Sequence, residues 1–384
     1  MISIIKNFPV VIHQLFFLFS QLLILYIYGI GYSGSLAYIG AISTFLAVLI
    51  NLRWDIEIMV NKSQRLSLSL SNASITIIFM TIAISCLNVV LGSPIQIYII
   101  LSALAIAIHE LLVSVLFIQK KIYVYSFFRT IPAISLISLA LIGFEPEIVW
   151  PASFLLSVFF LVIYYRNLFK RVIINMSLNR IKKIKLIDKI NAAITATTFS
   201  FFSALFVIII NFYYGDDYVG LWANTIRIFN SALIFLLAAS LPFALNMLRD
   251  KNFAFEKVMT FFYLWLLLLP LIVVSFLVVS NFGVSIFSIF KTFDSEITNT
   301  NLSIIFFIGT AISFIGSTQG LYQAINKSIV LFLMILITSL FGLFAILNFT
   351  LTFSALIKIF LLLTLTIVSM ILIHFIYHLT YKIK

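Results

Sequence analysis

The chain has 384 residues, of which 63% are hydrophobic and only 9% are charged. Soluble domains are roughly 45–50% apolar and about 25% charged, so this composition leaves too little polar surface for a water-soluble protein. It excludes a disordered chain, a disulfide scaffold, a coiled coil and a nucleic-acid-binding domain. An all-α polytopic membrane protein remains. At roughly 20 apolar residues per crossing, the length allows up to about a dozen spans.

Twelve apolar runs of membrane-spanning length follow one another along the chain. We predict spans at 8–28, 35–52, 73–90, 95–118, 122–142, 148–165, 191–212, 218–246, 255–279, 302–325, 329–348 and 353–380. The first run lacks a small-residue cleavage site, so we expect it to stay in place as an uncleaved first helix.

The basic residues predict the orientation of these spans. Twenty of the 24 Lys and Arg residues fall at the two termini or after even-numbered spans, whereas the opposite side has only Lys291. Cytoplasmic loops carry the excess of Lys and Arg, so we expect both termini in the cytoplasm. The external loops are short, the longest covering about 280–301, and leave no room for an external domain.

A short motif occurs twice, 186 residues apart. Residues 28–37 read YGIGYSGSLA and residues 214–223 read YGDDYVGLWA, with five identities in ten positions. In each case the motif joins the first two spans of a six-span half. Chance recurrence of Gly and Tyr at interfacial turns is the alternative. A real repeat predicts two six-helix lobes, 1–165 and 191–384, related by a pseudo-twofold axis along the membrane normal.

The stretch 166–190 is the predicted linker between the lobes and the most basic part of the chain. Its Lys and Arg residues alternate with Ile and Leu. This pattern fits an amphipathic segment on the anionic inner leaflet. It equally fits a solvated connector that obeys the preference for positive charge in the cytoplasm.

Four charged residues fall inside predicted spans, more than three residues from either end: Glu110, Arg129, Arg227 and Lys358. A charge near the bilayer centre costs roughly 2.5–3.5 kcal/mol on insertion scales, so such residues are functional candidates that should face a cavity or a partner. Arg227 is about nine residues into its span, or roughly 13 Å, which places it near the midplane. Asn224, Arg227 and Ser231 share one helix face, and we predict that they bind substrate.

Neighbouring spans carry further polar stripes, at Asn191, Thr195 and Thr198 and at Thr310, Ser313 and Ser317. Together with the face that includes Arg227, these stripes predict a polar cleft lined mainly by the second half of the chain. The alternative is that small polar residues only pack helices together.

The role of each of the other intramembrane charged residues can be interpreted in two ways. Arg129 and Lys358 are candidate substrate ligands, but both lie near enough to a span end to snorkel to the interface. Glu110 could carry a coupling proton, or it could pair with Arg129 as a structural ion pair. His13 on the first span is a second candidate for ion coupling, although a lone histidine is more often structural.

The net charge inside the membrane is positive, with three basic residues against one acidic residue. A pathway for cationic drugs would be expected to show the reverse. The interior therefore favours an anion, and phosphate suits the planar fork of Arg. The sequence contains no P-loop, GxSxG, HExxH or Cys/His cluster, so we predict neither an enzyme nor a cofactor or metal site.

Several segments resemble the O-antigen flippases of the polysaccharide transporter family, within the multidrug/oligosaccharidyl-lipid/polysaccharide (MOP) exporter superfamily. The segments are Tyr28-Gly29 through Gly34, Leu52-Arg53-Trp54-Asp55-Ile56-Glu57-Ile58, Gln119-Lys120-Lys121 to Arg129, and Phe202 through Tyr214-Gly215 and Trp222 to Arg227 and Leu248-Arg249. Helix number, orientation and the six-plus-six repeat are also similar over the whole chain.

The resemblance implies a flippase of the bacterial inner membrane. Its substrate would be an undecaprenyl-diphosphate-linked oligosaccharide repeat unit, moved to the periplasmic leaflet by alternating access. Its partners would be membrane lipids and other polysaccharide-assembly membrane proteins, with no nucleic acid.

Three other classes fit parts of the sequence. A multidrug or other small-solute exporter of the same superfamily shares the architecture but should carry acidic residues in the cleft. A major-facilitator transporter also has six plus six spans, yet the loop after the second span lacks the expected Gly-Asp-Arg-Gly-type signature. A membrane O-antigen polymerase or ligase would need a large external loop.

Overall fold

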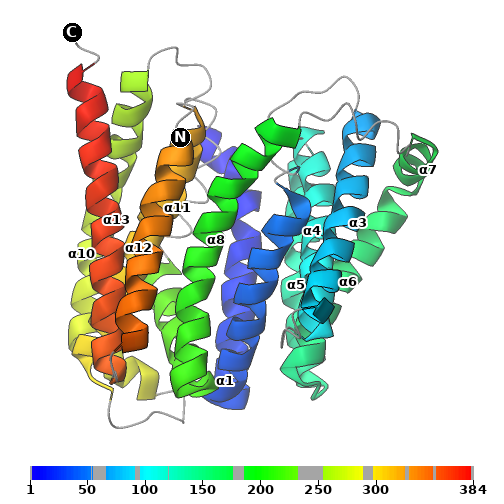
Figure 1. The fold of residues 1–384 in the computed structure, drawn as a ribbon. Helices are drawn as coiled ribbons and strands as arrows, with labels where there is room; N and C mark the ends of the chain where they lie inside the picture. The colour runs from blue at the N-terminus through cyan, green and yellow to red at the C-terminus, as the bar shows by residue number, and fades with distance from the viewer. Residues whose placement is uncertain are drawn as a thin grey trace. The chain divides into compact units, whose positions relative to one another are not determined.

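The computed structural model describes residues 2–52, 54, 66–90, 96–119, 121–175, 186–231, 254–288, 297–324, 328–348 and 352–381. Within these ranges every regular element is an α-helix (Figure 1). They are α1 (Ile2–Asn51), α3 (Leu66–Val90), α4 (Ile97–Ile118), α5 (Ile122–Leu141), α6 (Pro146–Tyr164), α7 (Arg166–Asn175), α8 (Leu186–Tyr214), the helical segment 216–231, α10 (Ala254–Ser288), α11 (Asn299–Ala324), α12 (Ser328–Asn348) and α13 (Phe353–Tyr381). Nine helices of this described part are long and apolar enough to cross a membrane, so the chain is a multi-pass membrane protein.

Helix α1 contains the first two predicted spans, separated by a backbone break at Gly29. This residue has φ 83° and ψ −175°, a conformation that glycine adopts without a steric penalty. An unbroken helix of 50 residues would extend about 75 Å, more than twice the roughly 30 Å of a bilayer core. The break therefore divides α1 into two arms that correspond to the predicted spans 8–28 and 35–52.

The second copy of the sequence motif has its break at the equivalent glycine. Gly215, which separates α8 from the segment 216–231, has φ 80°. The two copies also contact each other. A Cβ atom at Gly34 would lie 1.8 Å from the carbonyl oxygen of Asp216, and one at Gly220 would lie 2.2 Å from that of Ile30.

These two contacts, which we name the glycine crossing, are reciprocal. Ile30 and Asp216 occupy equivalent positions of the motif, as do Gly34 and Gly220. Each copy therefore presents the same surface to the other, which is the pattern of contacts around a twofold axis. The paired breaks and the glycine crossing favour a real internal repeat over a chance recurrence.

The chain divides into two compact units. The N-terminal unit comprises Ile2–Ile24 and Ser35–Ser200, and the C-terminal unit comprises Leu25–Gly34 and Phe201–Lys384. The glycine crossing lies within the C-terminal unit, because the segment 25–34 belongs to it. The boundaries of the predicted lobes, 1–165 and 191–384 with the linker 166–190, stay a prediction.

Helix α4 is the centre of the N-terminal unit. It packs against α3, α5 and α6, and it buries alanines such as Ala103 and Ala107 at these contacts. Small residues let helices approach closely, and in a membrane such van der Waals packing drives helix association. Gly40 serves the same purpose on α1, because a Cβ there would lie 2.7 Å from the Trp150 ring on α6.

Helix α11 has the corresponding place in the C-terminal unit, where it packs against α10, α12 and α13. It also contacts the helical segment 216–231 through Gly309, whose Cβ would lie 2.2 Å from Asn230 Nδ2 and 3.0 Å from Ile226 Cγ1. Trp222 of that segment packs edge-on against Phe360 of α13 with ring centroids 5.9 Å apart. These contacts fix the helix that carries Arg227.

Helices α1 and α3 begin at Ile2 and Leu66, six and seven residues before the predicted starts at 8 and 73. Three other places also differ from the predicted spans. Helix α10 continues to Ser288, past the predicted end at 279, because its last turns are still largely apolar and bury Phe287. Ser280 and Asn281 are accommodated within it, since their side chains donate to the Leu277 carbonyl at 3.2 and 2.8 Å. The linker 166–190 contains α7 and the start of α8. The predicted span 218–246 is described only as far as residue 231.

Candidate functional site

Arg227 is half-buried on the helical segment 216–231 of the C-terminal unit. Its Nη1 donates to Oδ1 of Asn224, one helical turn earlier, at 3.4 Å. Among the residues that the structure describes, no carboxylate lies within 4.0 Å of the guanidinium. The positive charge of Arg227 is therefore not neutralised within the described part of the chain.

Asn224 supports Arg227 from within the unit. Its side chain is fully buried, and its Nδ2 donates to Ser33 Oγ at 3.0 Å and to the Gly220 carbonyl at 2.7 Å. These bonds orient the amide so that its oxygen is directed to Arg227. The sequence predicts that Asn224 binds substrate directly. In this structure the buried Asn224 orients the Arg227 guanidinium, and its role as a substrate ligand stays a prediction.

The other polar residues near Arg227 bond mainly to their own helices. Ser231 donates to the Ile228 carbonyl at 3.1 Å. On α11, Thr310 and Ser313 donate to carbonyls one turn earlier at 3.0 and 2.9 Å. Such bonds are what the helix-packing interpretation expects, and a polar cleft along these stripes stays a prediction. The side chains of Asn191, Thr195 and Thr198 lie outside the described part of the structure.

Lys358 lies in the second turn of α13, in the same unit as Arg227. Its side chain is exposed on the surface of the unit. This exposure fits a lysine that snorkels from the end of a span, and its role as a substrate ligand stays a prediction.

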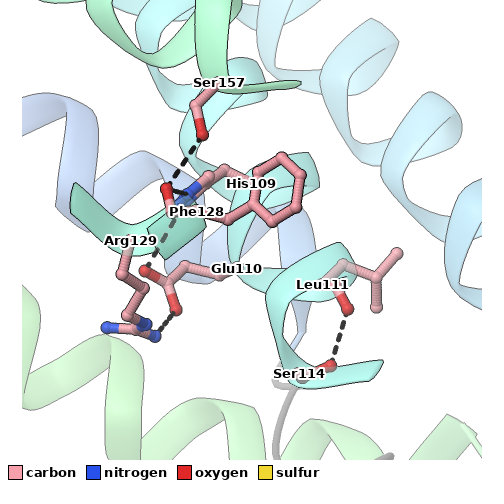
Figure 2. Close-up of polar contacts among 7 residues, drawn as sticks. All are labelled: His109, Glu110, Leu111, Ser114, Phe128, Arg129 and Ser157. Carbon is pink, nitrogen blue, oxygen red and sulfur yellow. Dashed lines mark hydrogen bonds and ion pairs between the residues drawn. The ribbon is translucent and has the colours of Figure 1, made fainter. Parts of the chain in front are cut away.

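Glu110 and Arg129 form an ion pair in the N-terminal unit. Figure 2 shows the Arg129 guanidinium from α5 directed at the Glu110 carboxylate from α4, where Nη2 donates to Oε2. The guanidinium also lies over the Tyr125 ring, 5.2 Å from its centroid. The sequence predicts that Glu110 either carries a coupling proton or pairs with Arg129, and the structure shows the pairing. The charge of Arg129 is consequently neutralised by Glu110, and the role of Arg129 as a substrate ligand stays a prediction.

A freed backbone carbonyl organises the surroundings of this ion pair. Pro132 lies inside α5 and has no N–H to donate, so the carbonyl of Phe128 loses its normal helical partner four residues later. That carbonyl instead accepts from Ser157 Oγ of α6 at 3.2 Å. His109 Nε2 of α4 lies 3.4 Å from the same oxygen (Figure 2). One carbonyl therefore connects three helices next to Glu110.

Two histidines are close to the Glu110 carboxylate. His109 Nδ1 lies 3.8 Å from Glu110 Oε1, and His109 is buried. His13 of α1 is also buried, and its charge when protonated would act on Glu110. The Glu110 carboxylate, the Arg129 guanidinium and the His109 imidazole thus meet in one polar cluster that could exchange a proton, and His13 acts on this cluster through its charge. The sequence does not predict the parts of Ser157 and the Phe128 carbonyl, although Pro132 within a span is a signal for a freed carbonyl.

The fold is that of MATE transporters. The chain matches a mutant of VcmN, a MATE transporter from Vibrio cholerae, with TM-score 0.60 and 14% identity over 100% of this chain and 97% of that one. It matches the MATE multidrug transporter DinF-BH, solved as a complex, with TM-score 0.58 and 14% identity, covering 97% and 93%. An inward-facing multidrug resistance MATE family transporter of the MOP superfamily matches with TM-score 0.52 and 14% identity, covering 96% and 92%.

Comparisons with models of protein families and with curated proteins find no match. At these identities the structural likeness shows the fold alone. It agrees with the predicted MOP-type architecture of about twelve helices in two six-helix lobes.

Proposed function

We propose that the protein is a MOP-type flippase that moves an undecaprenyl-diphosphate-linked oligosaccharide across the bacterial inner membrane by alternating access. The observation that carries this proposal is the half-buried guanidinium of Arg227, which has no carboxylate partner among the described residues. A diphosphate supplies paired oxygens that match the planar fork of Arg, so the two groups can bond bidentately.

The surroundings of Arg227 support an anionic ligand. An unpaired charge within a span is costly, so its retention suggests a function. The amide of Asn224 is held by Ser33 and Gly220, and its oxygen in turn orients the guanidinium. A binding group that is oriented before the ligand arrives loses less conformational entropy on binding. The Arg227 guanidinium would thus already be oriented when the diphosphate head group arrives.

The second candidate is a multidrug exporter, and the structural neighbours favour it. Two of them are named as multidrug transporters, and one of these was solved as a complex. The charge distribution favours the flippase. A cationic drug would be repelled by Arg227, and the carboxylate of Glu110, the acidic residue inside the predicted spans, is already paired with Arg129.

Arg227→Ala tests the proposal. In cells that depend on this protein for surface polysaccharide, we expect the variant to reach the membrane at the normal level and to lose polysaccharide display. Arg227→Lys should retain part of the activity, because a point charge binds phosphate without the bidentate geometry. Ser138→Ala removes an exposed hydroxyl of the N-terminal unit that bonds only to its own helix, and this control should display polysaccharide normally. Normal display by Arg227→Ala would refute the assignment.

A binding measurement separates the two candidates. The purified protein is titrated with a polyprenyl diphosphate and, in parallel, with a cationic dye. We expect the diphosphate to bind and Arg227→Ala to weaken it at least tenfold. Binding of the dye alone, together with dye resistance in cells, would instead support the multidrug exporter.

We further propose that the cluster around Glu110 couples transport to an ion gradient. Protonation of Glu110 would remove the charge that Arg129 pairs with, and His109, whose Nδ1 lies 3.8 Å from Glu110 Oε1, is placed to exchange that proton. Glu110→Gln mimics the protonated carboxyl. It should reduce transport and leave diphosphate binding at Arg227 unchanged, because the two groups belong to different units.

A further inference from the structure

A short basic helix leaves the N-terminal unit at the end of α6. The backbone turns at Tyr165, which has φ −99° and ψ 18°, and α7 follows over Arg166–Asn175. In Figure 1 its axis turns away from that of α6. Since α6 ends at the side that is predicted to be cytoplasmic, α7 lies at the level of the cytoplasmic membrane surface.

One side of α7 is attached to the helix bundle. Val172 is only 3% exposed, and its carbonyl accepts a hydrogen bond from Ser71 Oγ of α3 at 3.0 Å. The last four carbonyls of a helix have no partner within the helix, so this bond satisfies a group that would otherwise be free. The helix is therefore held against α3 in a fixed rotation about its own axis.

That rotation leaves two basic residues of α7, Arg166 and Lys170, on the outside. Arg166 and Lys170 are exposed, and residues four apart share one face of a helix. Lys121 lies at the same end of the unit, because its Nζ donates to the Tyr164 hydroxyl at 3.1 Å just before α7 begins. Within the described part of the chain, none of these three cations has a carboxylate within 4.0 Å.

We propose that Lys121, Arg166 and Lys170 form a binding surface for the phosphate groups of anionic phospholipids in the adjacent leaflet. The surface combines three cations that have no carboxylate within 4.0 Å in the described part of the chain, a helix whose buried side holds it against α3, and the half-exposed ring of Tyr164, a residue type typical of the interface. Each basic residue close to an anionic bilayer strengthens the binding of the protein surface to that bilayer about fivefold, so Arg166 and Lys170 together strengthen it roughly 30-fold.

The experiment measures which lipids contact α7 in the full-length protein. Cys86 is replaced by Ala, and Asn167→Cys on the exposed part of α7 carries a fluorescent label. The protein is reconstituted into vesicles of phosphatidylcholine mixed with phosphatidylglycerol, in which one or the other lipid is brominated and quenches the label. We expect brominated phosphatidylglycerol to quench far more than its share of the mixture, and high salt to abolish the preference because it screens charge.

Variants decide whether the α7 residues cause this preference. Arg166→Gln with Lys170→Gln should weaken it by up to about 30-fold, whereas Arg166→Lys with Lys170→Arg, which keeps both charges, should retain it. Lys382→Gln with Lys384→Gln removes the same charge elsewhere and should change nothing. Equal quenching by the two lipids in the unmodified protein, or an undiminished preference after the α7 charges are removed, would overturn the proposal.

Discussion

Substitution of Gly34 by alanine tests the glycine crossing, on which the case for an internal repeat depends. The added Cβ would lie 1.8 Å from the carbonyl oxygen of Asp216 and 2.8 Å from the backbone nitrogen of Gly220. Carbon and oxygen approach to roughly 3.3 Å even in close C–H···O contacts, so the two backbones must separate by about 1.5 Å. Both neighbouring atoms belong to the backbone, and no side-chain rotation can relieve the overlap.

We expect Gly34→Ala to lower the free energy of unfolding by about 2–3 kcal/mol. Overpacking costs roughly 1–3 kcal/mol and sometimes more, and the gain in helix propensity from Gly to Ala returns at most about 1 kcal/mol. Backbone neighbours place this site at the upper end of the range. The measurement is an equilibrium unfolding titration of the full chain in detergent, supported by the temperature at which half of the protein aggregates.

Gly31→Ala is the matched control. Gly31 lies one turn earlier in the same arm of α1, and its added Cβ would meet Oδ1 of Asp217 at 2.7 Å. That atom is the end of a flexible side chain and can rotate away, so we expect a change of less than about 1 kcal/mol. If Gly34→Ala proves as stable as Gly31→Ala, the backbones do not touch at Gly34 and the reciprocal crossing is refuted.

Three further predictions concern the charged residues. Glu110→Gln should lower the free energy of unfolding by about 2–3 kcal/mol, because it removes the carboxylate that pairs with Arg129. In a double-mutant cycle, adding Arg129→Gln to the same chain should recover at least half of this loss. If the two losses simply add, the pairing is contradicted. Asn224→Asp places a carboxylate next to Arg227 and should weaken polyprenyl diphosphate binding at least tenfold, while the variant reaches the membrane at the normal level. Unchanged binding would refute the assignment of Arg227 to the binding site. Lys358→Ala should change transport less than twofold, and a loss as large as that of Arg227→Ala would make Lys358 a substrate ligand.

The sequence predicts the helices well because bilayer thickness sets their length and lipid requires continuous apolar runs. The end of α10 is the instructive error. Ser280 and Asn281 look like the start of a loop, but their side chains are satisfied by the Leu277 carbonyl, and the apolar residues that follow, including the buried Phe287, keep the chain helical. The break at Gly29 falls between two predicted spans because the apolar pattern is interrupted there.

The candidate site is less predictable, because it depends on which helices face each other. That Arg227 lies within a span follows from the sequence, whereas the burial of Asn224 against Ser33 joins residues 191 positions apart. The hydrogen bonds around Phe128 show the same limit. Pro132 in the sequence shows that a carbonyl is freed, but only the packing of α4, α5 and α6 shows that Ser157 and His109 reach it.

The structure changes what the intramembrane charges imply. The sequence gives three basic residues against one acidic residue, with no indication of how they are distributed. Glu110 and Arg129 neutralise each other in the N-terminal unit. Of the four intramembrane charged residues, the other two, Arg227 and Lys358, both belong to the C-terminal unit. A neutral ion pair cannot attract a distant diphosphate, but it can respond to a proton. The division of charge thus favours substrate recognition in the C-terminal unit and ion coupling in the N-terminal unit.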